Sequence, residues 1–450
     1  MNTKNKIVIV GAGLSGTLLA IRLAQRGYTI SLHEQLPDMR KEQLSGGRSI
    51  NLALSIRGLN ALEKAGMKEQ MLKECIPMKG RMIHPKGGEP FLSPYSGRSE
   101  DYINSVSRGG LNMAMLNKAE AMNNVSIHFN SKCLSVDLKN AIAAFRNTNT
   151  DETYTDQGEI VIGTDGAGSP VRRSLMAKTT DLLFNYSQNF LRHGYKELSI
   201  QPDANGGFKI EKNALHIWPR DQFMIIALPN LDATFTVTMF HPIGGEMGFD
   251  ALNTKEKVED FFTTHFAELI PYMPNYVEEY FNNPVGTLGT IKCYPWQAYG
   301  KTLVMGDAAH AIVPFYGQGM NASFEDVTVF NEVLDEYEGD WTTVFEIFQN
   351  RRAENTNAIA DLAIDNFTEM QDKVNDADFI KKRQIERQLE QQFPDYYSKY
   401  SLVTFRPEMP YAKAMKLGRK QDELLLKLCN QPDIDSMSLE SIHRALMKLR

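Results

Sequence analysis

The stretch Lys6–Gly16, KIVIVGAGLSG, decides the fold that this sequence predicts. Its first part, Lys6–Val10, is mainly β-branched and predicts a buried strand, and the following residues Thr17–Arg26 predict a helix. A glycine-rich turn between a strand and a helix is typical of dinucleotide-binding folds. The phosphates lie at the helix N-terminus, because its free N–H groups and its dipole favour negative charge.

Each glycine of this turn has a physical task, and an acidic residue follows at the expected distance. Gly11 allows the tight turn, Gly13 lets the backbone approach a pyrophosphate, and Gly16 lets the helix pack on the strand. A second predicted strand, Tyr28–His33, ends on Glu34, whose carboxylate can accept hydrogen bonds from a ribose. A GxGxxG pattern alone also occurs in ordinary turns, but strand, helix and acid together predict a dinucleotide site.

Length and composition restrict the class of protein. A chain of 450 residues predicts two or three domains, and a net charge of −6 gives no reason to expect nucleic acid or an anionic membrane as partner. The four cysteines are scattered without a CxxC, which suggests neither a metal site nor a disulfide framework and fits a reducing compartment. The sequence has no signal peptide and no apolar run of about 20 residues. We therefore expect a cytoplasmic protein without a membrane anchor.

The middle and the end of the chain differ in pattern. In Thr234–Phe240 apolar residues alternate with threonines, which predicts an antiparallel sheet. The chain from Asp326 onward is predicted to be mostly helical, and Ile56–Glu74 is predicted to form one helix. The strands expected in the middle are Asn213–Trp218, Gln222–Leu228 and Thr234–Phe240.

Two further motifs place an acid beside a glycine at the end of a predicted strand. Asp165-Gly166 follows Glu159–Gly163, and Gly306-Asp307 follows Leu303–Met305. Such an acid can receive ribityl or ribose hydroxyls, or shape a loop around a pyrophosphate. Either motif alone is an ordinary turn, but three such sites at strand ends favour one dinucleotide site.

These motifs resemble a known group of flavoenzymes. GAGLSG, TDGAG and LVMGDAAHAIVPFYGQGMN are similar to motifs of the single-component FAD-dependent aromatic hydroxylases, the para-hydroxybenzoate hydroxylase type. Within that group the chain resembles the kynurenine 3-monooxygenase family over nearly its whole length. The motifs that carry this closer resemblance are RSINLALSIRG, GRMIHP, SVSRGGLN, IVIGTDGA, PFYGQGMN, AIDNFTEM and YSLVTF.

The resemblance implies an α/β fold with three parts. Residues 1–180 and 290–330 are expected to form a discontinuous, Rossmann-like FAD-binding domain. Residues 181–289, with part of 75–105, are expected to form an inserted β-sheet substrate domain. Residues 331–450 are expected to form a helical C-terminal region that closes the substrate site.

The resemblance also implies a reaction. NADPH reduces a non-covalent FAD, the reduced flavin captures O2, and a flavin C4a-hydroperoxide converts L-kynurenine to 3-hydroxykynurenine in tryptophan catabolism. The cofactor carries the chemistry, so we expect no catalytic side chain and no metal. A single dinucleotide fingerprint fits, because this class does not hold NADPH in a second Rossmann domain.

The resemblance assigns FAD contacts along the chain. Arg108 is expected to meet an FAD phosphate or ribose, although a surface salt bridge is its alternative interpretation. Gly319, Met320 and Asn321 are expected to offer backbone groups near the flavin ring at a helix N-terminus. His310 is expected to be a packed structural histidine. The full predicted set is Gly11, Gly13, Ser15, Gly16, Glu34, Ala53, Arg108, Asp165, Asp307, Gly319, Met320 and Asn321.

Four other residues are expected to bind the substrate. The resemblance assigns Arg81 of GRMIHP to the substrate carboxylate, and a guanidinium offers the planar, bidentate donor that a carboxylate requires. The resemblance adds Tyr95, Asn366 and Tyr400 as polar contacts. Phe240 is expected either to line the ring pocket or to pack in the core.

One position departs from the pattern, and three other functions stay open. Tyr316 stands where some bacterial relatives have histidine, so a hydrogen bond from that side chain to substrate is in question. A flavin hydroxylase of another aromatic acid would keep the FAD motifs without needing Arg81 or Tyr400. A nicotinamide dehydrogenase would leave Gly306-Asp307 without a task. A non-catalytic, flavin-binding regulator would bind FAD without turnover.

Overall fold

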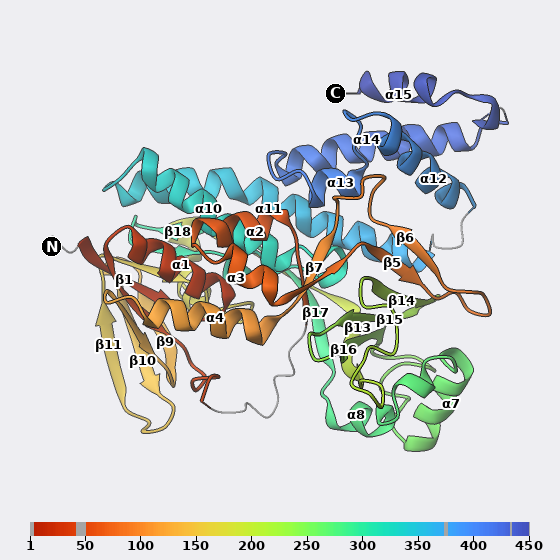
Figure 1. The fold of residues 1–450 in the computed structure, drawn as a ribbon. Coiled ribbons are helices and arrows are strands. Elements are labelled where there is room, and N and C mark those ends of the chain that lie inside the picture. The colour runs from red at the N-terminus through yellow and green to blue at the C-terminus, as the bar shows by residue number, and fades with distance from the viewer. Residues whose placement is uncertain (1–3, 42–50, 373–376, 433, 450) are drawn as a thin grey trace.

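The computed structural model describes residues 4–41, 51–372, 377–432 and 434–449. Figure 1 shows an α/β part on the left, a second sheet at lower right and a group of helices at upper right. The long helix α11 (Trp341–Asp372) runs between the first and the last of these. The architecture agrees with the predicted combination of a Rossmann-like part, a β-sheet part and a helical C-terminal region.

The α/β part is built on a six-stranded sheet, in which β1 (Lys4–Val10) lies between β12 and β2. Its strand order is β18–β19–β12–β1–β2–β8, and all pairs are parallel except β18–β19. Helix α1 (Leu14–Gln25) packs against both α4 and α10. The other elements named here are β2 (Tyr28–His33), β8 (Val125–His128), β12 (Ile160–Gly163), β18 (Gln297–Ala298), β19 (Thr302–Val304), α4 (Arg108–Glu120) and α10 (Gly319–Glu336).

The second sheet has seven strands in the order β17–β13–β16–β15–β14–β5–β6. The predicted alternation holds: Phe235, Val237 and Met239 lie in one apolar cluster with helix α7 (Lys255–His265). Phe240 lies in a different cluster, on the side of the sheet that faces α11. The strands are β5 (Gly80–Ile83), β6 (Phe91–Pro94), β13 (Asn185–Ile200), β14 (Leu215–Arg220), β15 (Phe223–Pro229), β16 (Phe235–Pro242) and β17 (Gly286–Tyr294).

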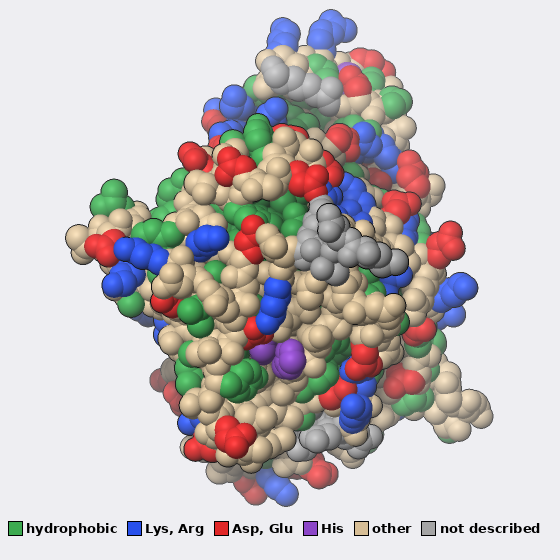
Figure 2. Space-filling model, turned by 90° about the vertical axis from the view of Figure 1, so that its left-hand side faces the viewer, with side chains coloured by type: hydrophobic (Ala, Val, Ile, Leu, Met, Phe, Trp, Pro, Cys, Tyr) green, Lys and Arg blue, Asp and Glu red, His purple; other side chains and the backbone are tan. Residues whose placement is uncertain are grey.

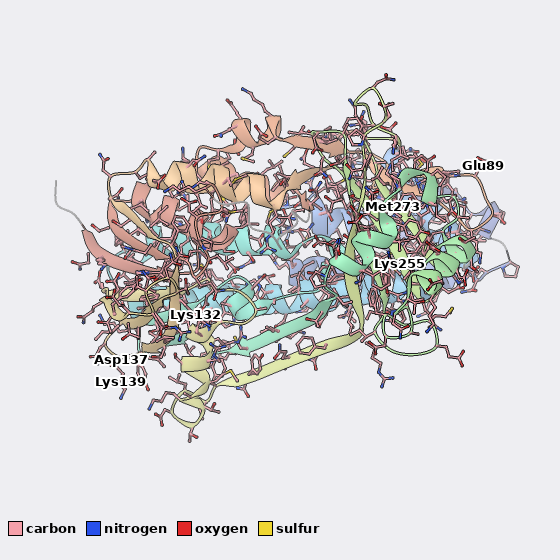
Figure 3. All side chains as sticks on the ribbon, turned by 90° about the horizontal axis from the view of Figure 1, so that it is seen from below. Glu89, Lys132, Asp137, Lys139, Lys255 and Met273 are labelled. Carbon is pink, nitrogen blue, oxygen red and sulfur yellow. The ribbon has the colours of Figure 1, made fainter. Side chains whose placement is uncertain are left out.

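Two small sheets complete the β structure. The sheet β11–β10–β9, which the sequence analysis did not predict, and helix α7 lie at opposite ends of the molecule in Figure 3, where Asp137 and Lys255 mark them. The other small sheet, β3–β7–β4, precedes α4. The strands are β3 (Asn51–Leu54), β4 (Cys75–Met78), β7 (Ile103–Ser107), β9 (Ser131–Asp137), β10 (Ile142–Asn147) and β11 (Thr153–Gln157).

The C-terminal helices form their own apolar cluster, in which Leu389, Tyr396 and Leu425 are fully buried. Helix α14 packs against α11, α12 and α13, which joins this group to the rest of the molecule. The helices are α12 (Ala377–Gln392), α13 (Lys399–Thr404), α14 (Tyr411–Cys429) and α15 (Leu439–Met447).

One predicted element is wrong. The expected single helix Ile56–Glu74 is divided into α2 (Ile56–Lys64) and α3 (Lys68–Lys73). Gly66 has φ +69°, a left-handed conformation that ends a helix at low cost only for glycine. The first three residues of the motif RSINLALSIRG, residues 48–50, lie outside the described part of the chain.

The surface, the cysteines and the helices each add one observation. Lys and Arg side chains are interspersed with Asp and Glu over the face shown in Figure 2. All four cysteines are buried as free thiols. Within the described ranges, none of the helices combines the length and the apolar character that crossing a bilayer requires.

Candidate functional site

The predicted FAD motifs meet at one edge of the parallel sheet. Strands β19, β12, β1 and β2 are consecutive neighbours and run in the same direction. Their carboxyl ends therefore lie side by side, where ligands of open α/β sheets bind. The residues that follow these ends are Gly306-Asp307, Asp165-Gly166, Gly11 and Glu34.

The three glycines of GAGLSG differ in what requires them. Gly11 has φ +99°, and a Cβ there would lie 2.7 Å from the carbonyl oxygen of Thr164. A Cβ on Gly16 would lie 1.9 Å from the carbonyl oxygen of Gly11. A Cβ on Gly13 would meet nothing within 4 Å. The protein's own packing therefore requires Gly11 and Gly16, whereas Gly13 borders open space at the N-terminus of α1.

Glu34 and Ser15 connect this loop to its neighbours. The Glu34 carboxylate accepts hydrogen bonds from the N–H of Ala12 (2.9 Å) and of Leu36 (3.0 Å), so it lies against the glycine loop. Ser15 is in direct contact with the Gly306-Asp307 motif, because a Cβ on Gly306 would lie 2.9 Å from the Ser15 hydroxyl. The glycine loop and the Gly306-Asp307 motif, which are far apart in the sequence, thus lie side by side.

Arg108 and Asp307 are both exposed and both begin a helix, α4 and α9 (Asp307–His310). Neither side chain has a hydrogen-bond or ion-pair partner among the residues that the structure describes. The alternative interpretation of Arg108, a surface salt bridge, therefore finds no support in the described part of the chain. Both charges are available to a ligand.

The side chain of Asp165 is used differently. Its carboxylate accepts hydrogen bonds from the Ser169 hydroxyl (2.6 Å) and the Val171 N–H (3.1 Å). Burial raises the pKa of this carboxyl group, against the effect of those hydrogen bonds. Asp165 thus stabilises the start of helix α5 (Pro170–Met176), and its backbone lies against Gly11. It shapes the loop, which is one of the two tasks considered for it.

Gly319, Met320 and Asn321 are the first three residues of α10, so the predicted helix N-terminus is present. The first N–H groups of a helix have no partner within the helix and attract electron-rich groups. The side chain of Asn321 donates to the Ala53 carbonyl (2.8 Å) and accepts from the Ser55 N–H (2.9 Å). This places Ala53 beside the start of α10.

The residues fit FAD. A glycine turn with open space in front of a helix, an exposed arginine and an exposed aspartate suit a pyrophosphate and sugar hydroxyls. The N-terminus of α10 is a second place for an electron-rich group, on the side of Ala53. Sequence reasoning could point to these residues because each belongs to a local motif, and their contact with FAD stays a prediction.

Asp326 forms a buried network with His310 and Arg352 behind the Gly306-Asp307 motif. Of these residues, only His310 was considered in the sequence analysis. His310 is buried and its Nε2 lies 2.5 Å from Asp326 Oδ2, which confirms the structural interpretation of this histidine. Asp326 also accepts a hydrogen bond from the Gly306 N–H (3.0 Å) and one from Arg352 (2.7 Å). Burial alone would raise the pKa of Asp326, but His310 and Arg352 lower it. No motif marks Asp326 or Arg352, because their partners are brought together only by folding.

Three of the four predicted substrate residues meet directly. The Arg81 guanidinium, on β5, lies 4.7 Å from the ring centre of Tyr400 and 5.5 Å from that of Tyr95. The rings of Tyr95 and Tyr400 are stacked with centroids 5.4 Å apart. These residues come from β5, from the loop after β6 and from α13.

Tyr316 extends this group toward the start of α10. Its ring stacks on that of Tyr400 at 5.5 Å, and it lies in a short 3-10 helix immediately before α10. The hydroxyls of Tyr95 and Tyr316 are buried and have no hydrogen-bond partner within the described structure. Burial raises the pKa of all three tyrosines, while Arg81 acts in the opposite direction on each. The phenols therefore stay neutral and can donate hydrogen bonds.

Asn366 and Phe240 both contact Phe315, the residue before Tyr316. Asn366, on α11, donates to the carbonyl of Phe315 at 2.6 Å. The Phe315 ring contacts Phe240 (4.9 Å) and Phe367 (4.3 Å). All of the predicted substrate residues thus border one group of aromatic side chains, and Phe240 belongs to it.

Comparisons with known proteins agree with this arrangement. A family model described as an FAD binding domain matches residues 4–192 and 289–341. Kynurenine 3-monooxygenase of Myxococcus xanthus is 45% identical over 426 residues, which cover 94% of this chain and 91% of that protein. The enzyme of the same name from Dictyostelium discoideum is 42% identical and covers 95% of this chain and 94% of its own length.

Solved structures show the same fold at lower identity. The tetrameric form of 2-methyl-3-hydroxypyridine-5-carboxylic acid oxygenase has a TM-score of 0.67 at 18% identity, covering 86% of this chain and 98% of that one. PqsL of P. aeruginosa in complex with 2-aminobenzoylacetate has a TM-score of 0.61 at 18% identity, covering 84% and 99%. The FAD-binding match and the identities of 45% and 42% over nearly the whole chain show that it belongs to the kynurenine 3-monooxygenase family.

Proposed function

We propose that this protein uses FAD, NADPH and O2 to hydroxylate L-kynurenine, giving 3-hydroxykynurenine. The proposal includes the predicted division into an FAD-binding part (1–180 and 290–330), a substrate domain (181–289, with part of 75–105) and a closing helical region (331–450). The free, buried cysteines support a reducing, cytoplasmic location.

The observation that carries this proposal is the position of Arg81. It is a half-buried guanidinium that faces two stacked tyrosines, and Tyr316 extends the same stack toward α10. An amino acid with an aromatic ring needs a bidentate partner for its carboxylate and flat apolar walls for its ring. Both are provided within one group of side chains.

Bound FAD supplies the electron transfer and the activation of oxygen, and the protein supplies the geometry. Gly11, Gly13 and Gly16 bring the backbone close to the pyrophosphate. Arg81 holds the substrate carboxylate, and the Tyr95 hydroxyl, which has no hydrogen-bond partner among the described residues, donates to the substrate. The aromatic rings around Tyr316 exclude water, which limits wasteful reduction of oxygen.

The test is a comparison of NADPH consumption with and without L-kynurenine. We expect purified, FAD-loaded protein to oxidise NADPH faster with kynurenine and to form a product heavier by one oxygen atom. Acid precipitation should release the flavin, because it is bound non-covalently. If another aromatic acid stimulates NADPH oxidation and kynurenine does not, that acid is the substrate and the assignment to kynurenine is wrong. Bound FAD without turnover would favour the regulator.

A further inference from the structure

Arg57 belongs to the RSINLALSIRG motif, and the proposed function gives it no task. It lies in the first turn of α2 with 1% of its side chain exposed. All the N–H donors that a guanidinium has are used here. One hydrogen bond goes to Glu325 on α10, at 2.5 Å. The other acceptors are the backbone carbonyls of Val403 (2.9 Å), Arg406 (3.1 Å), Pro407 (3.4 Å) and Met409 (2.6 Å).

The surroundings of Arg57 hold its side chain in one orientation. Its guanidinium stacks on the Tyr411 ring at 4.0 Å, and the Tyr411 hydroxyl donates to Gln318, the residue before α10, at 3.0 Å. Glu325 also pairs with Arg352. Glu325 and Tyr411 thus hold Arg57 in place, while its other donors bind residues 403–409, which form the end of α13 and the segment after it.

Residues 403–409 include the carboxyl end of α13, the helix on which Tyr400 lies. The last carbonyl groups of a helix lack partners within it and are stabilised by a positive charge. Other contacts hold the amino end of α13, where Lys399 pairs with Glu369 and Asp422, both at 2.7 Å. Arg57 holds the carboxyl end, so α13 is fixed by two different parts of the protein.

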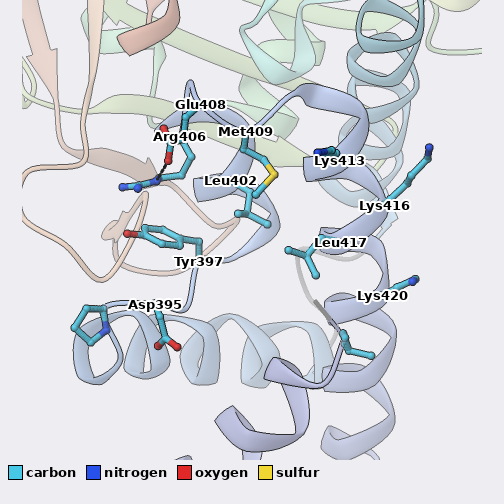
Figure 4. A pocket seen from close by; sticks show the side chains of 12 residues that line it. Asp395, Tyr397, Leu402, Arg406, Glu408, Met409, Lys413, Lys416, Leu417 and Lys420 are labelled. Carbon is cyan, nitrogen blue, oxygen red and sulfur yellow. Dashed lines mark hydrogen bonds and ion pairs between the residues drawn. The ribbon is translucent and has the colours of Figure 1, made fainter.

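The outer side of this segment is open. Leu402, Arg406, Glu408 and Met409 form one wall of a pocket of about 600 Å³, which Figure 4 shows beside α14. The Phe405 ring contacts Tyr95 and Tyr400, and Arg406 lies over the ring of Tyr397. The backbone carbonyls of residues 406, 407 and 409 are held by the hydrogen bonds to Arg57.

We infer that Arg57 is a positioning residue, which fixes the carboxyl end of α13 and thereby holds Tyr400 against Tyr95, Tyr316 and Arg81. This inference rests on the proposed function. In the coupled reaction, NADPH, a proton, O2 and substrate give NADP+, water and hydroxylated product. When the substrate is misplaced, NADPH, a proton and O2 give NADP+ and hydrogen peroxide instead. Small displacements of a reacting group have large effects on rate, so loosening α13 should favour peroxide.

The test measures hydroxylated product and hydrogen peroxide per NADPH in FAD-loaded Arg57→Lys. Lysine keeps the charge beside Glu325 but lacks the planar fork that reaches several carbonyls. We expect product per NADPH to fall by about threefold or more, with peroxide making up the difference and FAD content unchanged. Arg57→Met, which also removes the charge, should have a larger effect.

The matched control is Arg220→Lys. Arg220 is also a buried guanidinium that binds carbonyls, pairs with a glutamate (Glu268) and lies over an aromatic ring (Phe266). It joins β14 to the end of α7 and to His84, the residue after β5, and has no bond to residues 401–409 among the described contacts. We expect it to lower the melting temperature as much as Arg57→Lys while leaving product per NADPH unchanged. Equal coupling in the two variants and wild type would overturn the inference.

A second measurement does not depend on the substrate. Hydrogen exchange of amides 401–409 should quicken in Arg57→Lys and not in Arg220→Lys, because only the first loses the bonds to this segment. Unchanged exchange would refute the positioning claim even if kynurenine proves to be the substrate. Faster exchange in a protein that does not hydroxylate kynurenine would contradict only the proposed function.

Discussion

The residues predicted to bind FAD each belong to a short motif, and the motifs around Gly11, Glu34, Asp165 and Asp307 follow the ends of four neighbouring parallel strands. Those predicted to bind the substrate come from a strand, a loop and two helices that are far apart in the sequence. In the first site each motif determines its own backbone geometry, as the crowding around Gly16 shows. In the second, Arg81 and Tyr400 meet only because β5 and α13, which are far apart in the sequence, lie together in the fold. Substitutions in the FAD motifs should therefore reduce FAD binding or stability. Substitutions among the predicted substrate residues should reduce substrate binding.

The largest expected effect is that of Gly16→Ala. Its Cβ would lie 1.9 Å from the Gly11 carbonyl oxygen and 2.4 Å from the Thr164 hydroxyl, so the backbone must shift. We expect a loss of about 3 kcal/mol in the free energy of unfolding even without FAD. Chemical denaturation of the flavin-free protein measures this.

Gly13→Ala is the matched control for that variant. Its Cβ meets no protein atom within 4 Å, and its backbone already has a negative φ of −70°. We expect unchanged stability of the flavin-free protein but FAD binding weakened by about tenfold, or about 1.4 kcal/mol. Equal stability of the two alanine variants would contradict the distinction between packing glycines and a ligand glycine.

Arg81→Ala should have the next largest effect, confined to the substrate site. A charged hydrogen bond contributes about 1.5–3 kcal/mol, so kynurenine binding should weaken by at least about tenfold. Arg81→Lys should recover only part of this, because an ammonium lacks the planar fork. Titration of FAD-loaded protein, followed by flavin fluorescence, measures the affinity. Binding within about twofold of wild type would show that Arg81 does not hold the carboxylate.

Tyr95→Phe should have opposite effects on stability and on binding. The hydroxyl is buried and has no hydrogen-bond partner in the described part of the chain, so its removal should leave the kynurenine-free protein as stable or about 1 kcal/mol more stable. Kynurenine should bind about fivefold more weakly, because a donor is lost. Tyr411→Phe is the control, since its buried hydroxyl donates to Gln318 and should cost about 1 kcal/mol. A destabilised Tyr95→Phe would mean that its hydroxyl has a protein partner.

The smallest expected effect concerns the acid stability of the seven-stranded sheet, in which His241 lies on β16. Burial, with His193 and His265 nearby, lowers the pKa of His241 to about 4, although its bond to the Met247 carbonyl acts to raise it. The unfolded histidine, with its ordinary pKa of 6.5, takes up a proton first. The stability that depends on neutral His241 is therefore complete above pH 6.5 and falls as the pH drops toward 4. His241→Gln should reduce the loss between pH 6.5 and about pH 5 by about 1 kcal/mol; an unchanged pH profile would exclude this group.

Much of the fold was predictable from local patterns. Strands such as β1, β2 and β16 were found because alternation and β-branched runs depend on nearest neighbours. The division at Gly66 was missed because a glycine inside a helical pattern is compatible with a helix until the following turn packs elsewhere. The sheet β9–β11 was also missed, since its strands are partly exposed and contain many polar residues.

The sequence by itself determined the dinucleotide loop, the acids at the strand ends and the family resemblance, because each depends on residues close together in the chain. Only the tertiary structure decided that Arg81, Tyr95, Tyr316 and Tyr400 lie in contact, and that Arg57 donates to a carbonyl at the end of α13. The reason is physical. Hydrogen bonds and ring contacts between distant segments depend on how whole layers pack, and no spacing along the chain encodes that packing locally.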